Sequence, residues 1–261
     1  MRRIFGLLPC LTLAAFAQEP NPGRGVNFYS IEKEVALGRQ LAAEFQRNAR
    51  QLVSPAAQAY IQELGRRVAA ESAFTYTFLL FADDPTALHE PAAFPGGFVF
   101  VPASLILAAH DEDELAGMVA HAIAHIEARH GTKQASRAEI ARFTIPMIYM
   151  GGRAGSAIEH GNRMAIPMNM LALSRSYDLE ADSLAVGMMS AAGYDPAAFV
   201  RYLEREQPSD DATGTKWSAL PGRAERLRAV RTAVESIPPR AYERHAGFDS
   251  IQAEVLRLSA R

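Results

Sequence analysis

The sequence predicts an α+β fold that is mainly helical and contains a small sheet. Apolar residues recur at helical spacing along most of the chain. Two short runs, residues 74–81 and 98–101, are rich in β-forming residues. Hydrophobic residues make up 49% of the 261 residues, which is enough for a full buried core. A formal net charge of -2 without an extended basic face argues against nucleic acid as a partner.

Residues 1–17 fit the pattern of a secretory signal peptide. Two arginines precede a short apolar run, and Ala15-Phe16-Ala17 is a small-x-small cleavage site. A buried N-terminal helix is the weaker alternative, because Pro9 interrupts the run. We expect cleavage near Ala17, a linker at 18–29, a single domain at 30–261, and an exported protein that is periplasmic or secreted.

The apolar run at the N-terminus is too short to span a bilayer comfortably. Pro146, Gly151, Gly152 and Arg153 break the only other apolar stretch, so no integral membrane span is expected in the mature chain. The only cysteine, Cys10, would leave with the signal peptide. Any metal site must then use histidines and carboxylates.

Two amphipathic helices are expected first, from Ser30 to about Arg50 and from Pro55 onward with Ser54 as N-cap. The strand at 74–81 follows and ends in a turn, and the strand at 98–101 follows the turn Pro95-Gly96-Gly97. We expect these strands to belong to a sheet of about two to four strands.

The best-defined element is a helix that has Asp111 as N-cap and Glu114 three residues later, and that runs to Gly131. Residues 143–172 are rich in Met and suit either an adaptable apolar surface over a cleft or ordinary core filling. The remaining chain is expected to form helices and one loop: helices at 174–192, 197–205, 223–234 and 250–258, and the loop at 209–214.

The helix that starts at Asp111 carries His121 and His125 four residues apart, so both imidazoles project from one face and can share a zinc ion. In the H-E-x-x-H motif, the Glu takes a proton from the attacking water and passes it to the leaving amine. Ala122 stands at the position of that Glu and can do neither. His130, near the helix end, is expected to form a hydrogen bond rather than to bind metal.

A catalytic zinc site needs a third protein ligand. Asp178 and Asp182 share one face of the helix at 174–192, whereas Glu180 points roughly 200° away and is expected to be solvated or ion-paired. We expect Asp178 as the third ligand and Asp182 as acceptor of the second ring N–H of a ligand histidine. Arg175 is a candidate partner for a carboxylate or for a reaction oxyanion.

Three segments in this order, 95–101, 120–130 and 174–182, resemble the zinc metallopeptidase family that includes HtpX and the CAAX prenyl proteases, peptidase family M48. The resemblance covers about residues 30–235 and is closest to exported bacterial members. It implies a gluzincin-like, zincin-type domain with one Zn²⁺ per chain and an edge strand that binds extended substrate. The residues expected to form that substrate-binding edge are Gly96, Gly97, Phe98, Val99 and Phe100.

The chain departs from the family pattern at three positions of the site. Ala122 and Asp178 stand where the family has Glu, and Leu220 stands where many members have a His before the Pro. Asp178 is shorter by one methylene, about 1.5 Å, so zinc affinity is expected to fall without vanishing. The loss of the base is more serious, because general acid–base catalysis is worth roughly 10²- to 10⁴-fold.

Three functions are compatible with this site: an active zinc endopeptidase whose Glu was deliberately changed to Ala, a natural pseudoprotease that binds extended or misfolded polypeptide, or a remnant that binds neither. The second change, at Asp178, and the signal segment favour a natural origin. Retention of His121, His125, Asp182 and Arg175 argues against a remnant. We therefore expect a periplasmic quality-control protein with impaired hydrolysis; the sequence does not predict its oligomeric state.

Overall fold

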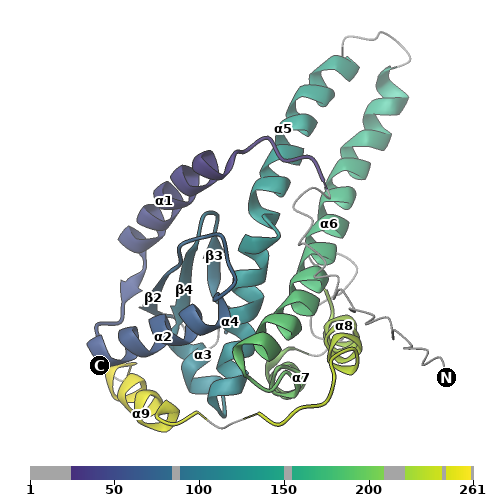
Figure 1. The fold of residues 1–261 in the computed structure, drawn as a ribbon. Coiled ribbons are helices and arrows are strands. Elements are labelled where there is room, and N and C mark those ends of the chain that lie inside the picture. The colour runs from purple at the N-terminus through teal and green to yellow at the C-terminus, as the bar shows by residue number, and fades with distance from the viewer. Residues whose placement is uncertain (1–24, 84–88, 150–154, 209–220, 243–244, 260–261) are drawn as a thin grey trace, which may run out of the picture.

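The computed structural model describes residues 25–83, 89–149, 155–208, 221–242 and 245–259. The expected signal peptide and the expected loop at 209–214 lie outside the described residues. The described elements follow one another as α1 (Ile31–Asn48), β1 (Arg50–Gln51), α2 (Pro55–Val68), β2 (Thr77–Ala82), β3 (Ala92–Phe94), β4 (Phe98–Pro102), α3 (Ala103–Ala108), α4 (Glu112–Glu127), α5 (His130–Tyr149), α6 (Gly155–Ala192), α7 (Ala197–Glu206), α8 (Arg223–Glu235) and α9 (Phe248–Ser259). The prediction of a mainly helical α+β fold is confirmed (Figure 1).

The first two helices begin where capping residues predict. Ser30 accepts a hydrogen bond from the Lys33 amide at the start of α1. Ser54 accepts one from the Ala57 amide at 3.0 Å, and Pro55 occupies the first turn of α2. These side chains satisfy amide groups that have no partner within the helix.

The sheet has four strands in the order β1-β2-β4-β3. Strands β2 and β4 are parallel, and β3 pairs with β4 in antiparallel fashion, with Ala93 opposite Val99. The expectation that Phe98, Val99 and Phe100 form the edge is therefore wrong, because β4 lies inside the sheet. The edge beside α4 is β3, a strand of three residues whose sequence carries no alternating pattern.

The turn between β3 and β4 gives the two glycines a structural reason. Gly96 and Gly97 have φ values of 76° and 104°, in the region that favours glycine. A Cβ on Gly96 would lie 2.5 Å from Val35 Cα, and one on Gly97 would lie 2.3 Å from the Thr75 carbonyl oxygen. Both glycines are buried, so they fit the turn under α1 rather than a free edge.

The sheet separates two packed layers (Figure 1). On the α1 side, the rings of Phe45 and Phe100 pack in a tilted arrangement with centroids 4.6 Å apart. On the other side, Val99 and Val101 join the main core beneath α2 and α4. Because α4 lies in this core, its position relative to β3 is fixed by packing on most of its surface.

The predicted helix from Asp111 to Gly131 is interrupted. Helix α4 ends at Glu127, and Arg129 takes a left-handed conformation with φ 57° before α5 starts at His130. Helices α5 and α6 then form a hairpin that extends past the rest of the molecule (Figure 1). Within the described residues, the helices are either too short or too polar to cross a membrane.

Candidate metal centre

Helix α4 presents the two histidines of the site. Its N-terminus is capped by Asp111, which accepts a hydrogen bond from the Glu114 amide at 2.8 Å. His121 and His125 lie one turn apart on the face that α6 covers, and their Nε2 atoms are 3.1 Å apart. Two ring nitrogens at this separation converge on one point, as ligands of a single ion do.

Helix α6 supplies the third group. Asp178 Oδ1 lies 3.3 Å from His125 Nε2, and one ligand atom from each of His121, His125 and Asp178 lies within 4.8 Å of the others. The second carboxylate oxygen, Asp178 Oδ2, is buried and has no hydrogen-bond partner among the described residues. A buried carboxylate oxygen without a partner is costly unless a cation is bound, so these residues fit a zinc ion.

Asp182 lies behind His121, where helix periodicity placed it. His121 Nδ1 is 2.8 Å from Asp182 Oδ1, although the ring is not aligned for a regular hydrogen bond. Arg226 of α8 binds Asp182 through two parallel contacts of 2.9 and 2.8 Å. Asp182 is completely buried; burial opposes its charge, yet the Arg226 and His121 charges hold the pKa of its carboxyl well below the usual range.

Arg226 was missed from the sequence. Its guanidinium also donates to Glu90 Oε1 and to Gln207 Oε1, each at 2.9 Å, so its charge is buried among hydrogen-bond acceptors. The available signal was its position on α8, since it lies four residues before Val230 and therefore shares the buried face. A charged residue on an apolar face indicates a buried partner.

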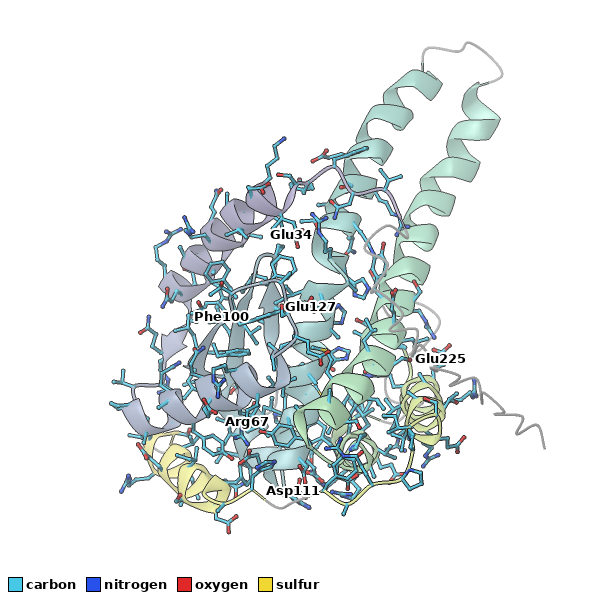
Figure 2. All side chains as sticks on the ribbon, in the orientation of Figure 1. Glu34, Arg67, Phe100, Asp111, Glu127 and Glu225 are labelled. Atoms are coloured by element: carbon cyan, nitrogen blue, oxygen red, sulfur yellow. The ribbon has the colours of Figure 1, made fainter. Side chains whose placement is uncertain are left out.

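The cleft at the site has a volume of about 380 Å³. Ala122 lines it with 2% of its surface exposed, and a methyl group therefore stands where the family has a carboxylate. Two further carboxylates line the cleft, and both are ion-paired: Glu34, which Figure 2 labels, with Arg129 at 2.6 Å, and Glu90 with Arg226 at 2.9 Å. Among the described lining residues, Asp178 is the carboxylate that faces the histidines.

The strand beside the cleft is β3. Pro91, Ala93, Phe94 and Pro95 line the cleft on this side. None of the five residues expected to bind substrate, from Gly96 to Phe100, belongs to this lining. An edge strand therefore flanks α4 as expected, but this strand is β3 and not β4, the strand that follows it in the chain.

A third histidine approaches the pair from α5. His130 Nδ1 lies 3.1 Å from His125 Nδ1, and its ring stacks on Tyr177 with centroids 4.3 Å apart. Burial lowers the pKa of His125, and burial is also the main cause that lowers the pKa of His130 to about 2, with repulsion from Lys133 adding to it. Both imidazoles are therefore held neutral, which is the form that binds metal.

Arg175 pairs with a carboxylate, the first of its two expected partners. Its guanidinium contacts Glu225 of α8, which Figure 2 places beside α6. Arg175 is absent from the described cleft lining. Leu220, the third departure from the family pattern, lies outside the described residues.

The comparisons with known proteins agree with this geometry. The model of peptidase family M48 matches residues 55–234. The chain is 26% identical over 191 residues to the beta-barrel assembly-enhancing protease of Escherichia coli K12. The matched stretch covers 67% of this chain and 38% of that protein. The protein of the same name from Yersinia pestis is 26% identical over 217 residues, covering 77% and 42%.

A mitochondrial relative is more similar over a shorter stretch. Mitochondrial metalloendopeptidase OMA1 of Saccharomyces cerevisiae is 30% identical over 125 residues, which is 47% of this chain and 35% of that protein. The chain thus spans less than half the length of these relatives. The family match includes the histidines of α4 and Asp178 of α6, and this chain belongs to peptidase family M48, whose metallopeptidases are zinc-dependent.

Proposed function

We propose that this chain is an exported, zinc-binding member of family M48 that holds extended or misfolded polypeptide and hydrolyses it poorly or not at all. The observation that carries the proposal is Ala122, because this cleft-lining residue has a methyl group where the family has the catalytic carboxylate. The residues around Ala122 still form a possible metal site, because His121, His125 and Asp178 converge and Asp182 contacts His121.

Zinc would be held by His121, His125 and Asp178, and when bound it would supply a Lewis acid for a peptide carbonyl. The side chains of this chain determine what else can happen. Asp182 keeps His121 oriented, with Arg226 holding Asp182 in turn. The Ala122 methyl can neither accept a proton from water nor deliver one to the leaving amine, so hydrolysis would lose roughly 10²- to 10⁴-fold.

The polypeptide would bind along β3. An exposed edge strand pairs with an extended segment through backbone hydrogen bonds, which depend little on sequence. The apolar cleft residues Pro91, Phe94 and Ile126 would accept apolar side chains of the type that misfolded proteins expose. The names of two relatives connect them with β-barrel assembly, and by analogy we propose a role in periplasmic protein quality control.

The test begins with zinc content and casein cleavage of natively purified protein. We expect about one zinc per chain, as in sites with three protein ligands, and negligible cleavage. Ala122→Glu should then introduce proteolysis that a chelator abolishes, and Ala122→Gln is the matched control, because it has the same size without a base. Asp178→Glu combined with Ala122→Glu is the second variant if the first is weak.

Three results would contradict the proposal. Absence of zinc would remove the metal site, and cleavage by the unaltered chain would favour an active peptidase. Equal activity of Ala122→Glu and Ala122→Gln would show that a missing base is not what limits hydrolysis.

A further inference from the structure

His130 is placed against the side of His125 that faces away from the proposed zinc. It is the first residue of α5 and is 3% exposed. Its Nδ1 lies 3.1 Å from His125 Nδ1, while His125 Nε2 faces His121 and Asp178. The two nitrogens of His125 therefore have separate neighbours, one set at the metal site and one at His130.

Hydrogen bonding fixes which nitrogen carries each proton. If His125 binds metal through Nε2, its Nδ1 must carry the proton and can only donate. His130 Nδ1 must then accept, which places the His130 proton on Nε2. That nitrogen lies 3.4 Å from Glu180 Oε2, so it faces an acceptor as this assignment requires. The contacts of His130 on both sides are thus mutually consistent.

The position of the His130 ring is restrained from three directions. Its plane lies 17° from that of Tyr177 in a stacked arrangement, and it meets the His125 ring nearly edge-on at 80°. The left-handed Arg129 turns the chain just before it, and Arg129 is itself held by Glu34 at 2.6 Å. A ring restrained in this way can orient a neighbouring ring at little further entropic cost.

We propose that His130 is a positioning residue for the metal site. Its Nδ1 accepts the Nδ1 proton of His125, which fixes the tautomer and orientation that present His125 Nε2 to zinc. Glu180, at the surface, is the last acceptor in this series of hydrogen bonds. The inference rests on the proposed zinc site. It gives His125 a support distinct from the Asp182 and Arg226 pair behind His121, because it ends at a carboxylate that is 50% exposed.

The first test measures zinc affinity of the full chain by competition with a chromophoric chelator. His130→Phe keeps a planar ring on Tyr177 but removes the acceptor, and we expect affinity to fall about 10- to 100-fold, as for other outer-shell partners. His130→Asn places an amide oxygen near the position of Nδ1 and should recover most of that loss. His110→Asn, at an exposed histidine, is the matched control and should bind as the unaltered chain does.

The second test detects the hydrogen bond without a substitution. In the zinc-loaded chain, ¹⁵N spectra of the histidine rings should show His125 protonated at Nδ1, and cobalt substitution should give a ligand-field spectrum that changes in His130→Phe and is restored in His130→Asn. A His125 ring without an Nδ1 proton, or equal zinc affinity in all three proteins, would overturn the inference. Failure of the unaltered chain to bind zinc would instead overturn the proposed function itself.

Discussion

Asp178 differs from the family's Glu but keeps a carboxylate beside the histidines. A shorter side chain has replaced Glu, yet its Oδ1 comes within 3.3 Å of His125 Nε2 and its Oδ2 is buried without a partner. The Asp178 carboxylate therefore reaches the histidines despite its shorter side chain.

We expect Asp178→Ala to lower zinc affinity by more than about 100-fold, because loss of an outer-shell partner alone costs 10- to 100-fold. Asp178→Asn keeps the size and removes the charge, so its zinc affinity should lie between that of Asp178→Ala and that of the unaltered chain. Competition titration with a chelator measures both. Affinity of Asp178→Ala equal to that of the unaltered chain would exclude this residue as a ligand.

Arg226 shows how much a single buried charge can matter. It is almost fully buried, and so is Asp182, the carboxylate that it binds. We expect Arg226→Met to lower the free energy of unfolding by about 3–5 kcal/mol, because it leaves a buried carboxylate without its cation. Denaturation in urea measures this change.

The double variant Arg226→Met with Asp182→Asn is the control for the buried charge. Removing both charges should restore part of the lost stability, since the buried carboxylate that Arg226 neutralises is then gone, while Glu90 loses its cation in both variants. If the double variant loses as much free energy of unfolding as Arg226→Met and Asp182→Asn lose in sum, the two residues do not act as a pair.

The turn between α4 and α5 is the element that joins the metal-binding helix to the rest of the site. Arg129 has φ 57°, a conformation that disfavours a side chain by about 1 to 2 kcal/mol. Its guanidinium donates to Glu34 Oε2 and to the Tyr29 carbonyl, both at 2.6 Å. These contacts offset the strain and keep the turn closed.

Two substitutions at Arg129 separate backbone strain from side-chain contacts. Both Arg129→Ala and Arg129→Gly lose the guanidinium, but only Ala keeps the strained backbone. After allowance for the greater freedom of Gly in the unfolded chain, the Gly variant should be the more stable by roughly 0.5 to 1 kcal/mol. Thermal and urea unfolding measure the difference, and a more stable Ala variant would contradict it.

The elements differ in how far the sequence could predict them. The N-caps of α1, α2 and α4 are Ser30, Ser54 and Asp111, as the sequence predicts. These helix starts could be predicted because a cap is a local signal within three residues. The placement of Asp178 and Asp182 on one face also follows from local periodicity. Strand β3 could not be found in this way, since three residues carry no period and its pairing with β4 depends on the intervening turn.

The remaining parts of the site depend on contacts between distant segments. Arg226 reaches Asp182 across 44 residues, and Glu34 meets Arg129 across 95. Side-chain spacing along one helix cannot report such pairs. The sequence could therefore predict the three residues that converge in the structure, whereas the residues that hold them in place required the folded structure.

At the scale of the whole molecule, distant parts of the chain meet at the cleft: residues of β3, α4, the start of α5 and the C-terminal half of α6 line it, together with Glu34 of α1. The α1 layer covers the opposite face of the sheet and holds the β3–β4 turn through its contact with Gly96. In the sheet that the described residues form, β3 is thus the outer strand on the side of the cleft, which Ala93 and Phe94 line. An extended segment paired with β3, as proposed, would lie beside the histidines.

The edge can be tested by blocking it. Ala93 lies in the middle of β3 and lines the cleft, so Ala93→Trp should fill part of the space that a bound segment would occupy. We expect its affinity for a permanently unfolded casein, measured by fluorescence anisotropy, to fall at least about 10-fold, or 1.4 kcal/mol. Leu256→Trp is the matched control, because Leu256 is 59% exposed on α9, which contributes no residue to the described cleft lining. Equal weakening by both substitutions, or by neither, would place polypeptide binding elsewhere than along β3.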